Sequence, residues 1–388
     1  MKYAHKLIGQ GLVDPPGPLI GGLDADLVWN RSHTLQPMLE KVVAGLNVAA
    51  ILFARPAEPY RSLIDHLLAR MPADSPALCP QDSENRTFLH ELPVVRNLSA
   101  ASLVRALKQR KCAIIPGRGI ISYGTVSPEQ AYIVFSSVCF SLFVKAFVDF
   151  YDDLRTGRRD DTLEALIGKG KAYYQICLKD AGSHPDLRKG PFDNGKDAIQ
   201  AICEVGRLTV NKQMVDSFFG NISYRLGNRI YISQTTSSLD ELEGCIDPCA
   251  LDDSQCTAIT ASSEYPAHKS VYQQSDLRAI LHGHPKFSVI ASLLCEHRET
   301  CENSRDCHIK CTRDRRVGQV PILPGETGTG PYSIAATLPE PLARHKAAII
   351  YGHGVFTTGR YDFRDAFERL LSVEQASFDA YFDNIQRL

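Results

Sequence analysis

The chain has 388 residues, of which 44% are hydrophobic and 22% charged, and its 43 Lys and Arg nearly balance its 44 Asp and Glu. This length exceeds what a single compact core usually supports, so we expect two domains. The balanced charge, with no basic block interleaved with aromatic residues, lacks the electrostatic footprint of phosphate-backbone binding and argues against a nucleic-acid partner.

The N-terminal segment and the most apolar segment both predict a cytoplasmic protein without a membrane partner. Residues 1–18 lack the apolar core of a secretory signal. The longest apolar run, residues 131–144, is shorter than the roughly 20 residues that span a bilayer, so we expect a buried helix there. The 12 cysteines are then expected to be thiols or metal ligands rather than disulfides.

Two pairs of segments resemble one another at nearly constant spacing. Residues 49–56 (AAILFARP) match 278–285 (RAILHGHP), 229 positions further on. Residues 112–124 (CAIIPGRGIISYG) match 347–359 (AAIIYGHGVFTTG), 235 positions further on. Self-similarity of this length predicts a duplicated domain rather than a short solenoid repeat.

A weaker third match relates residues 11–16 (GLVDPP) to 244–249 (GCIDPC), 233 positions apart. The polar, Gly-rich stretch 181–197 is the expected boundary between the two copies. The predicted organisation is a degenerate first copy, a helical and polar linker and a catalytic second copy, at residues 1–155, 156–195 and 196–388.

Hydrophobic periodicity in the second copy predicts an α/β domain in which helices cover a sheet. Gly227-Asn228 is a hairpin turn, and Phe287, Ile290, Ala291 and Leu294 are expected to form one face of a helix. In chain order, we predict a helix at 197–210, strands at 221–226 and 229–233, a helix near 265–275, a strand at 278–282, strands at 347–352 and 355–359 and an amphipathic helix at 362–386.

Three histidines of the second copy fit a metal site. Side chains two apart in a strand point to one face, so His282 and His284 can converge where the strand ends. Pro285 suits the first turn of the following helix, and His353 lies between two glycines at another strand end. Three neutral imidazoles with an open fourth position are typical of catalytic zinc, with other divalent transition metals as alternatives.

The repeat strengthens this prediction, because a lone His-x-His is more often a packing feature than a ligand pair. The aligned positions in the first copy carry Phe53, Arg55 and Arg118, so all three histidines are missing together while the apolar scaffold persists. Ligands of one ion would vanish as a set, whereas packing histidines have no reason to do so.

Glu264 follows Ser262 and Ser263 shortly before the first histidine pair. A carboxylate beside a divalent ion can accept a proton from the substrate, which makes Glu264 a candidate general acid or base. The alternative is a solvated acid at a helix start.

Four spaced motifs connect the second copy to a known family. They are Gly220-Asn221-Ile222-Ser223, Ser262-Ser263-Glu264, His282-Gly283-His284 and Gly352-His353-Gly354. With these motifs in this order, residues 196–386 resemble the class II aldolase and adducin head-domain superfamily.

The resemblance implies two tandem three-layer α/β/α domains, each with a central, largely antiparallel sheet. It also implies that His282, His284 and His353 hold a divalent metal and that Glu264 is the acid or base. The pocket for a substrate phosphate would be lined by Gly220, Asn221, Thr235, Ser262 and Ser263. The chain departs from the family at Phe218 and Phe219, where Ser or Thr is common, and at Thr236, where a glycine is usual.

The resulting functional prediction is an aldolase-type lyase that acts on a small hydroxy-carbonyl or sugar-phosphate-like substrate through a metal-stabilised enediolate. Zinc is the expected metal, with manganese, iron and cobalt as alternatives. A dehydratase, decarboxylase or epimerase could use the same site. A non-catalytic, adducin-like assembly protein is the alternative from another class, and it predicts loss of the ligands in both copies.

The first copy is expected not to catalyse. Arg55 and Arg118 put fixed cations where the ion would sit, and they are either paired with acids or bind an anionic ligand. The resemblance also implies ring-shaped oligomers in which neighbouring subunits complete each active site. We therefore expect a homo-oligomer, for which a dimer of tandem chains could mimic a four-unit ring.

Two further segments hold candidate residues. Cys295, Cys301, Cys307 and Cys311 lie within 17 residues and form either a second metal site or a redox-sensitive, reduced loop, although their spacing matches no zinc-finger pattern. The Gly- and Pro-rich stretch 320–331 is either a wall of the pocket, with Glu326 touching substrate, or a plain connection.

Overall fold

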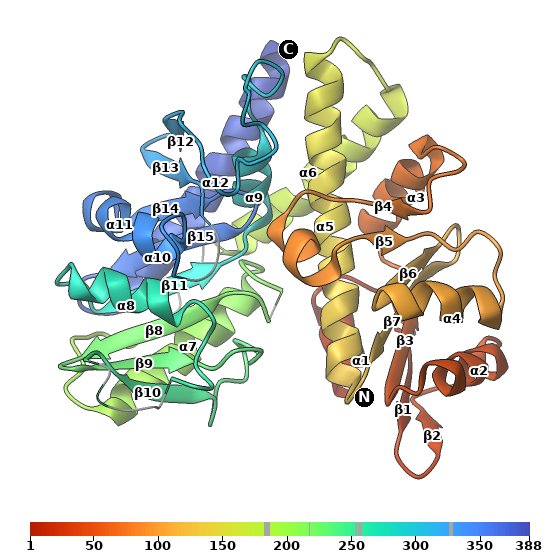
Figure 1. The fold of residues 1–388 in the computed structure, drawn as a ribbon, viewed down its shortest axis with the longest axis horizontal. Helices are drawn as coiled ribbons and strands as arrows, with labels where there is room; N and C mark the ends of the chain where they lie inside the picture. The colour runs from red at the N-terminus through yellow and green to blue at the C-terminus, as the bar shows by residue number, and fades with distance from the viewer. Residues whose placement is uncertain (182–186, 217, 253, 255–257, 326–328) are drawn as a thin grey trace. The chain divides into compact units, whose positions relative to one another are not determined.

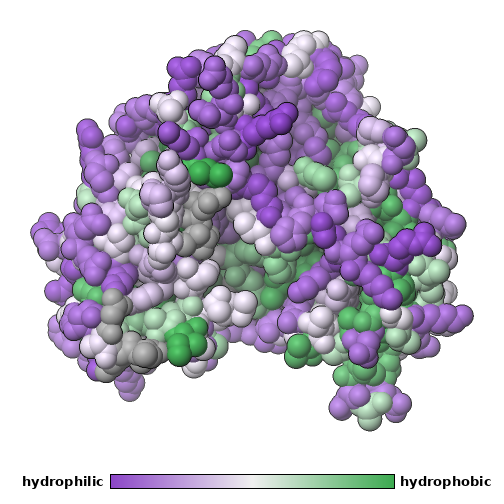
Figure 2. Space-filling model, in the orientation of Figure 1, coloured by the Kyte–Doolittle hydropathy of each residue, from purple (hydrophilic) through white to green (hydrophobic). Residues whose placement is uncertain are grey.

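The computed structural model describes residues 1–181, 187–216, 218–252, 254, 258–325 and 329–388. The chain forms two compact units, Met1–Tyr173 and Tyr174–Leu388, here called the N-terminal and C-terminal units. The division falls in helix α6 (Asp161–Ala181), inside the segment for which the sequence predicts a linker. Hydrophilic residues cover most of the face seen in Figure 2.

The N-terminal unit is a mixed α/β fold around an antiparallel sheet in the order β2-β1-β3-β7-β6. Helices α2 (Gln36–Leu46) and α4 (Ala100–Gln109) lie on one face of this sheet (Figure 1) and bury their apolar residues in its core. Helices α1 (Lys2–Gly9) and α3 (Tyr60–Arg70) pack against α5. The strands are β1 (Leu19–Leu23), β2 (Leu27–Trp29), β3 (Ala50–Ala54), β6 (Cys112–Ile115) and β7 (Gly119–Gly124), and a small ladder joins β4 (Ala77–Leu78) to β5 (Leu92–Pro93) around a π-helical turn, η1 (Asn85–Leu89).

Helix α5 (Pro128–Arg155) contains the longest apolar run and confirms the prediction of a buried helix. It is the one described helix that is long and apolar enough to cross a membrane, and 89% of its most apolar window is buried inside the protein. The helix packs on β7 and β3, so its apolar surface belongs to the core of the unit.

The C-terminal unit is built on an eight-stranded sheet in the order β10-β9-β8-β11-β15-β14-β13-β12. All neighbours are antiparallel except β13 and β14, which are parallel. The strands are β8 (Asn221–Leu226), β9 (Arg229–Ser233), β10 (Ile246–Ala250), β11 (Ala279–Gly283), β12 (Arg315–Val317), β13 (Val320–Leu323), β14 (Ala347–Ile350) and β15 (Gly354–Gly359).

Helices cover both faces of this sheet, which gives three layers (Figure 1). One face is covered by α8 (Tyr265–Gln273), α10 (Ile334–Thr337) and α11 (Pro339–His345). The other face is covered by α7 (Gly195–Asn211) and α12 (Phe363–Arg387), with α9 (Lys286–Leu293) packed on α12.

The helices and strands predicted for this unit are confirmed, including the hairpin at Gly227, but the prediction for α9 was wrong in two respects. The helix ends at Leu293, so Leu294 lies outside it, and Ala291 is only half-buried, whereas Phe287 and Ile290 are buried as predicted. Pro285 is the N-cap of the helix rather than part of its first turn: its backbone is extended (ψ 135°), and its carbonyl accepts a hydrogen bond from the Val289 amide at 3.2 Å.

The two units share the order and register of their central strands. Ala50 pairs with Gly124 in β3 and β7, and Ala279 pairs with Gly359 in β11 and β15, so both partners keep the offsets of 229 and 235. The same shifts relate β6–β7 to β14–β15, where Cys112–Ser122 corresponds to Ala347–Thr357. The ladder geometry is therefore repeated at the residue level.

The third sequence match was wrong. Residues 244–249 run into β10, a strand with no counterpart before β1, whereas residues 11–16 lie between α1 and β1. Their structural counterpart is the segment after α7, where Gln213 has a positive φ of 56° as Gly11 has one of 67°. The offset there is 202, because the chain between β8 and β11 is longer than that between β1 and β3.

Asp82 is a buried acid in the core of the N-terminal unit. Its Oδ1 accepts hydrogen bonds from the Asn85 amide (3.1 Å) and the Ser141 hydroxyl (2.8 Å), whereas its Oδ2 has no partner. Burial raises the pKa of Asp82 to about 6, because the charged form loses its hydration. The folded protein therefore keeps a proton between pH 4 and 6 that the unfolded chain has released, and stability falls as pH rises through this window.

We predict that Asp82→Asn removes this loss and raises the free energy of unfolding at pH 7 by up to about 3 kcal/mol, with little change near pH 4. Urea denaturation followed by the fluorescence of Trp29, the single tryptophan, reports on this unit. The exposed Asp24→Asn control should change stability by less than about 0.5 kcal/mol. An Asp82→Asn protein that loses stability between pH 4 and 6 as the wild type does would contradict the prediction.

Candidate active site

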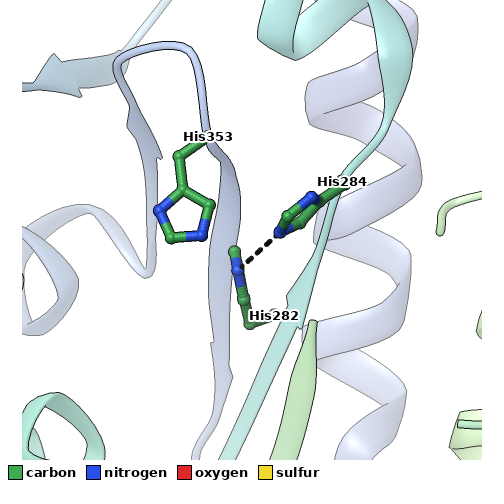
Figure 3. Close-up of side chains that lie close together, drawn as sticks. All are labelled: His282, His284 and His353. Atoms are coloured by element: carbon green, nitrogen blue, oxygen red, sulfur yellow. Dashed lines mark hydrogen bonds between the residues drawn. The ribbon is translucent and has the colours of Figure 1, made fainter. Parts of the chain in front are cut away.

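His282 and His284 lie at the end of β11, where the sheet directs both rings toward His353 (Figure 3). The Nδ1 of His282 lies 3.0 Å from the Val355 carbonyl oxygen, so that nitrogen donates its hydrogen there and Nε2 keeps a free lone pair. The His282 ring stacks on Phe356 at 3.9 Å between centroids and 9° between planes. Hydrogen bond and stack together fix this ring.

His353 lies in the tight turn between β14 and β15. Gly352 has a φ of +64°, which favours glycine, and its amide donates to the Ser292 hydroxyl at 2.7 Å. A Cβ on Gly354 would lie 2.4 Å from the Gly283 carbonyl oxygen and 2.9 Å from an atom of each of the His282 and His284 rings. The close approach of this turn to β11 therefore requires a glycine.

The three imidazoles form a compact cluster. Their ring centroids lie 4.9 to 5.0 Å apart, and the Nε2 atoms of His282 and His284 are separated by 3.1 Å. Within the described ranges, this is the one group of metal-binding side chains whose ligand atoms all lie within 4.8 Å of one another. Ring nitrogens held this close suit a shared cation between them, and three histidines match the donor set of catalytic zinc.

Glu264 lies at the start of α8 with its carboxylate turned into the cluster. Its Oε1 is 3.1 Å from His353 Nε2, and its Oε2 is 3.5 Å from His282 Nε2. The Asn221 side-chain amide donates to Oε2 at 2.7 Å. Asn221 stands beside His282 in the ladder between β8 and β11, so the sheet register places the partner of the carboxylate next to the histidine.

The electrostatics keep the carboxylate ionised and two rings neutral. Burial alone would raise the pKa of Glu264, but His282, His353 and the Asn221 amide hold that pKa well below its ordinary value. Burial lowers the pKa of His282 to about 4 and that of His284 well below its usual range. At neutral pH both rings therefore present lone pairs to a cation, next to a negative charge.

The sequence profile of the family described as Class II Aldolase and Adducin N-terminal domain matches residues 200–378. This range includes Glu264 and all three histidines. Residues 200–378 belong to the class II aldolase and adducin family. The match does not extend into the N-terminal unit, and no curated protein matches the chain significantly.

Several solved structures are similar to about half of this chain. An L-fuculose-1-phosphate aldolase from Thermus thermophilus is 21% identical over 49% of this chain and 95% of its own, with a TM-score of 0.40. A sugar-phosphate aldolase from Thermotoga maritima is 16% identical over 48% and 94%, with a TM-score of 0.35. The N-terminal class II aldolase domain of a conserved protein from Thermoplasma acidophilum is 14% identical over 51% and 99%, with a TM-score of 0.36.

Three of the five predicted phosphate-pocket residues of the aldolase-family unit lie at the cluster. Gly220 has a φ of +97°, and a Cβ there would lie 2.5 Å from the His282 carbonyl oxygen. Asn221 binds Glu264, and the Ser262 hydroxyl accepts a hydrogen bond from the Glu264 amide at 3.3 Å. Asn221 therefore holds the carboxylate of Glu264, and Ser262 holds its backbone.

Thr235 and Ser263, the other two residues of that set, have exposed side chains, and the described contacts do not link them to the cluster. The Thr235 amide donates to the Thr260 carbonyl at 2.9 Å and is not free for an anion. Thr236 has a φ of +58°, so the turn keeps the backbone shape that glycine usually provides in the family.

Sequence reasoning missed a buried polar network one helical turn from Glu264. His268 on α8 is fully buried, and its Nδ1 lies 2.6 Å from the Ser223 hydroxyl, which lies 2.8 Å from the Tyr272 hydroxyl. The four-residue spacing of Glu264 and His268 on one helix was the available signal. Phe219, whose ring lies 5.6 Å from that of His284, was noted only as a departure from the family.

The remaining candidates lie apart from the cluster. Cys295, Cys301, Cys307 and Cys311 are half-buried thiols, and among the described residues no three of them bring their sulfur atoms within 4.8 Å of one another. Burial, followed by the neighbouring Cys311, raises the pKa of Cys307, which disfavours its thiolate. Glu326 lies outside the described residues.

We predict that Gly354→Ala weakens metal binding by at least about tenfold and costs about 1–3 kcal/mol of stability, because the new Cβ meets backbone and two ligand rings at once. Metal content after dialysis, measured by mass spectrometry, and the melting temperature test both effects. The matched control is Gly168→Ala on α6, where a Cβ meets nothing within 4 Å. Unchanged metal content in Gly354→Ala would contradict the prediction, because it would show that the three histidine rings do not bind one shared ion.

Proposed function

We propose that the C-terminal unit is a metal-dependent lyase of the aldolase type that acts on a small hydroxy-carbonyl or sugar-phosphate-like substrate. The observation that carries the proposal is the cluster of three imidazoles with one ionised carboxylate at 3.1 and 3.5 Å from two of them. Membership in the class II aldolase and adducin family supports the reaction class. The unit keeps every ligand, whereas a non-catalytic assembly protein would be expected to lose them.

We propose zinc as the metal, because three neutral imidazoles with an open fourth position suit it, with manganese, iron and cobalt as alternatives. A divalent ion in this site would polarise adjacent oxygens of the substrate and stabilise the negative charge that develops when a carbon-carbon bond breaks or a proton leaves.

Glu264 is the proposed proton acceptor and donor. Its carboxylate is ionised, almost fully buried and oriented by the Asn221 amide, so it is ready to take a proton at a fixed position. Among the described residues, the buried Oδ1 of Asn221 has no hydrogen-bond partner, and this acceptor is suited to a substrate hydroxyl. His282, held by the Val355 carbonyl, stays neutral and cannot compete for the proton.

The N-terminal unit is proposed to be a degenerate copy of the same domain. Its ladder repeats the register of the C-terminal unit, but Leu19 pairs with Phe53 where Asn221 pairs with His282. At the same offset of 229 that relates β3 to β11, Leu35 before α2 stands where Glu264 precedes α8. Neither an acid nor a metal ligand is left at these positions.

We predict that His282→Ala lowers metal content to the background of a metal-free control, whereas Glu264→Gln keeps the metal and loses about 10²–10⁴-fold in turnover. Metal analysis tests the first effect. Lyase activity tests the second, with hydroxy acids and sugar phosphates as substrates and carbonyl products detected by NMR.

The control is His5→Ala, an exposed histidine on α1, which should change neither quantity. Metal retained in His282→Ala would remove the proposed site. Full activity in Glu264→Gln would assign the proton transfer to another group.

We also propose that the chain forms a homo-oligomer, with a dimer presenting four units of this fold. Light scattering coupled to gel filtration should then give twice the chain mass of 42.9 kDa. A single species at the chain mass over the micromolar range would contradict this prediction.

A further inference from the structure

A hollow lined by three arginines lies at the ends of the central strands of the N-terminal unit. Arg55 follows β3, Arg118 lies in the turn between β6 and β7, and Arg61 lies in the first turn of α3. The empty space between its walls, counted out to open solvent, is about 260 Å³, and the walls include Ile64, Leu68 and Ile115. We call it the arginine hollow.

The arginine hollow occupies the place that the metal cluster has in the other unit. Arg55 stands where the offset of 229 places His284, and Arg118 stands where the offset of 235 places His353. The two turns agree in hydrogen bonding, because the Arg118 amide donates to the Ile115 carbonyl as the His353 amide donates to the Ile350 carbonyl. The repeated ladder therefore brings Arg55 and Arg118 to one edge of the sheet.

Among the described residues, two of the three guanidinium groups make no ion pair. Arg61 is held by the Glu58 carboxylate at 2.7 Å. Arg55 and Arg118 have exposed side chains, and among the residues that the structure describes they make no ion pair or side-chain hydrogen bond. Within the described chain, pairing with acids therefore does not explain why Arg55 and Arg118 stand at these positions.

We propose that the arginine hollow binds a small dianion, the phosphate group of inorganic phosphate or of a phosphate monoester. The planar donor fork of arginine matches phosphate oxygens in a bidentate manner. Arg61 is already paired with Glu58, so Arg55 and Arg118 supply the two positive charges that a dianion would meet, with one negative charge on the lining Asp65.

The inference concerns a site other than the proposed active centre, so the two are tested separately. Titration calorimetry of the full chain with inorganic phosphate at low ionic strength should show binding to the wild type. The Arg55→Ala/Arg118→Ala variant should lose at least about tenfold in affinity, because it removes charge-assisted hydrogen bonds. The Arg55→Lys/Arg118→Lys variant keeps the charge and should retain part of the affinity.

Two controls locate the bound anion. Arg105→Ala/Arg344→Ala removes the same charge from exposed helix positions and should bind phosphate as the wild type does. His282→Ala, in the other unit, should also keep phosphate binding. Binding that persists in Arg55→Ala/Arg118→Ala, or that His282→Ala abolishes, overturns the proposal. Glycerol 3-phosphate tested beside inorganic phosphate distinguishes the sources: tighter binding of the ester assigns the hollow to monoesters, and equal binding assigns it to the phosphate group alone.

Discussion

Gly283 of β11 pairs with Val355 of β15, and through this antiparallel pairing the end of one strand meets the turn that begins the other. His282 and His284 come from the first strand end and His353 from the turn, so the cluster exists only while the ladder holds its register. A slip of one residue would turn His282 to the opposite face of the sheet. The Val355 carbonyl, itself in the ladder, also fixes the His282 ring. Backbone pairing and ligand orientation therefore depend on the same few hydrogen bonds.

Burial sets the chemistry of this cluster. Taking imidazoles out of water disfavours their charged forms, which leaves His282 and His284 as neutral donors. A buried carboxylate is costly unless it is hydrogen-bonded or paired, and Glu264 has both Asn221 and two histidines beside it. The hydrogen bonds among His268, Ser223 and Tyr272 join α8, the helix that begins just after Glu264, to strand β8.

The N-terminal unit shows that the ladder does not need the ligands. Its strands keep the same register although Phe53, Arg55 and Arg118 replace all three histidines. Gly119 is retained at the position of Gly354, and a Cβ there would lie 2.3 Å from the Ala54 carbonyl oxygen, so this glycine serves the close approach of the backbone. The strand ladder therefore forms independently of the residues at the ends of its strands. Those positions hold histidines in one unit and arginines in the other.

The sequence by itself determined the order of helices and strands in the C-terminal unit, the offsets of 229 and 235 and the identity of the histidine set, because periodicity, turn residues and a spoiled repeat are local signals. It misplaced the third match, since two hydrophobic hexapeptides can look alike without sharing a place in the sheet. Only the tertiary structure decided that Asn221 holds Glu264, that Thr235 and Ser263 lie exposed, that the four cysteines form no compact ligand cluster among the described residues and that Arg55 and Arg118 make no ion pair there. Those facts depend on contacts between residues distant in the chain, and a sequence pattern carries no information about which side chains a folded sheet finally brings together.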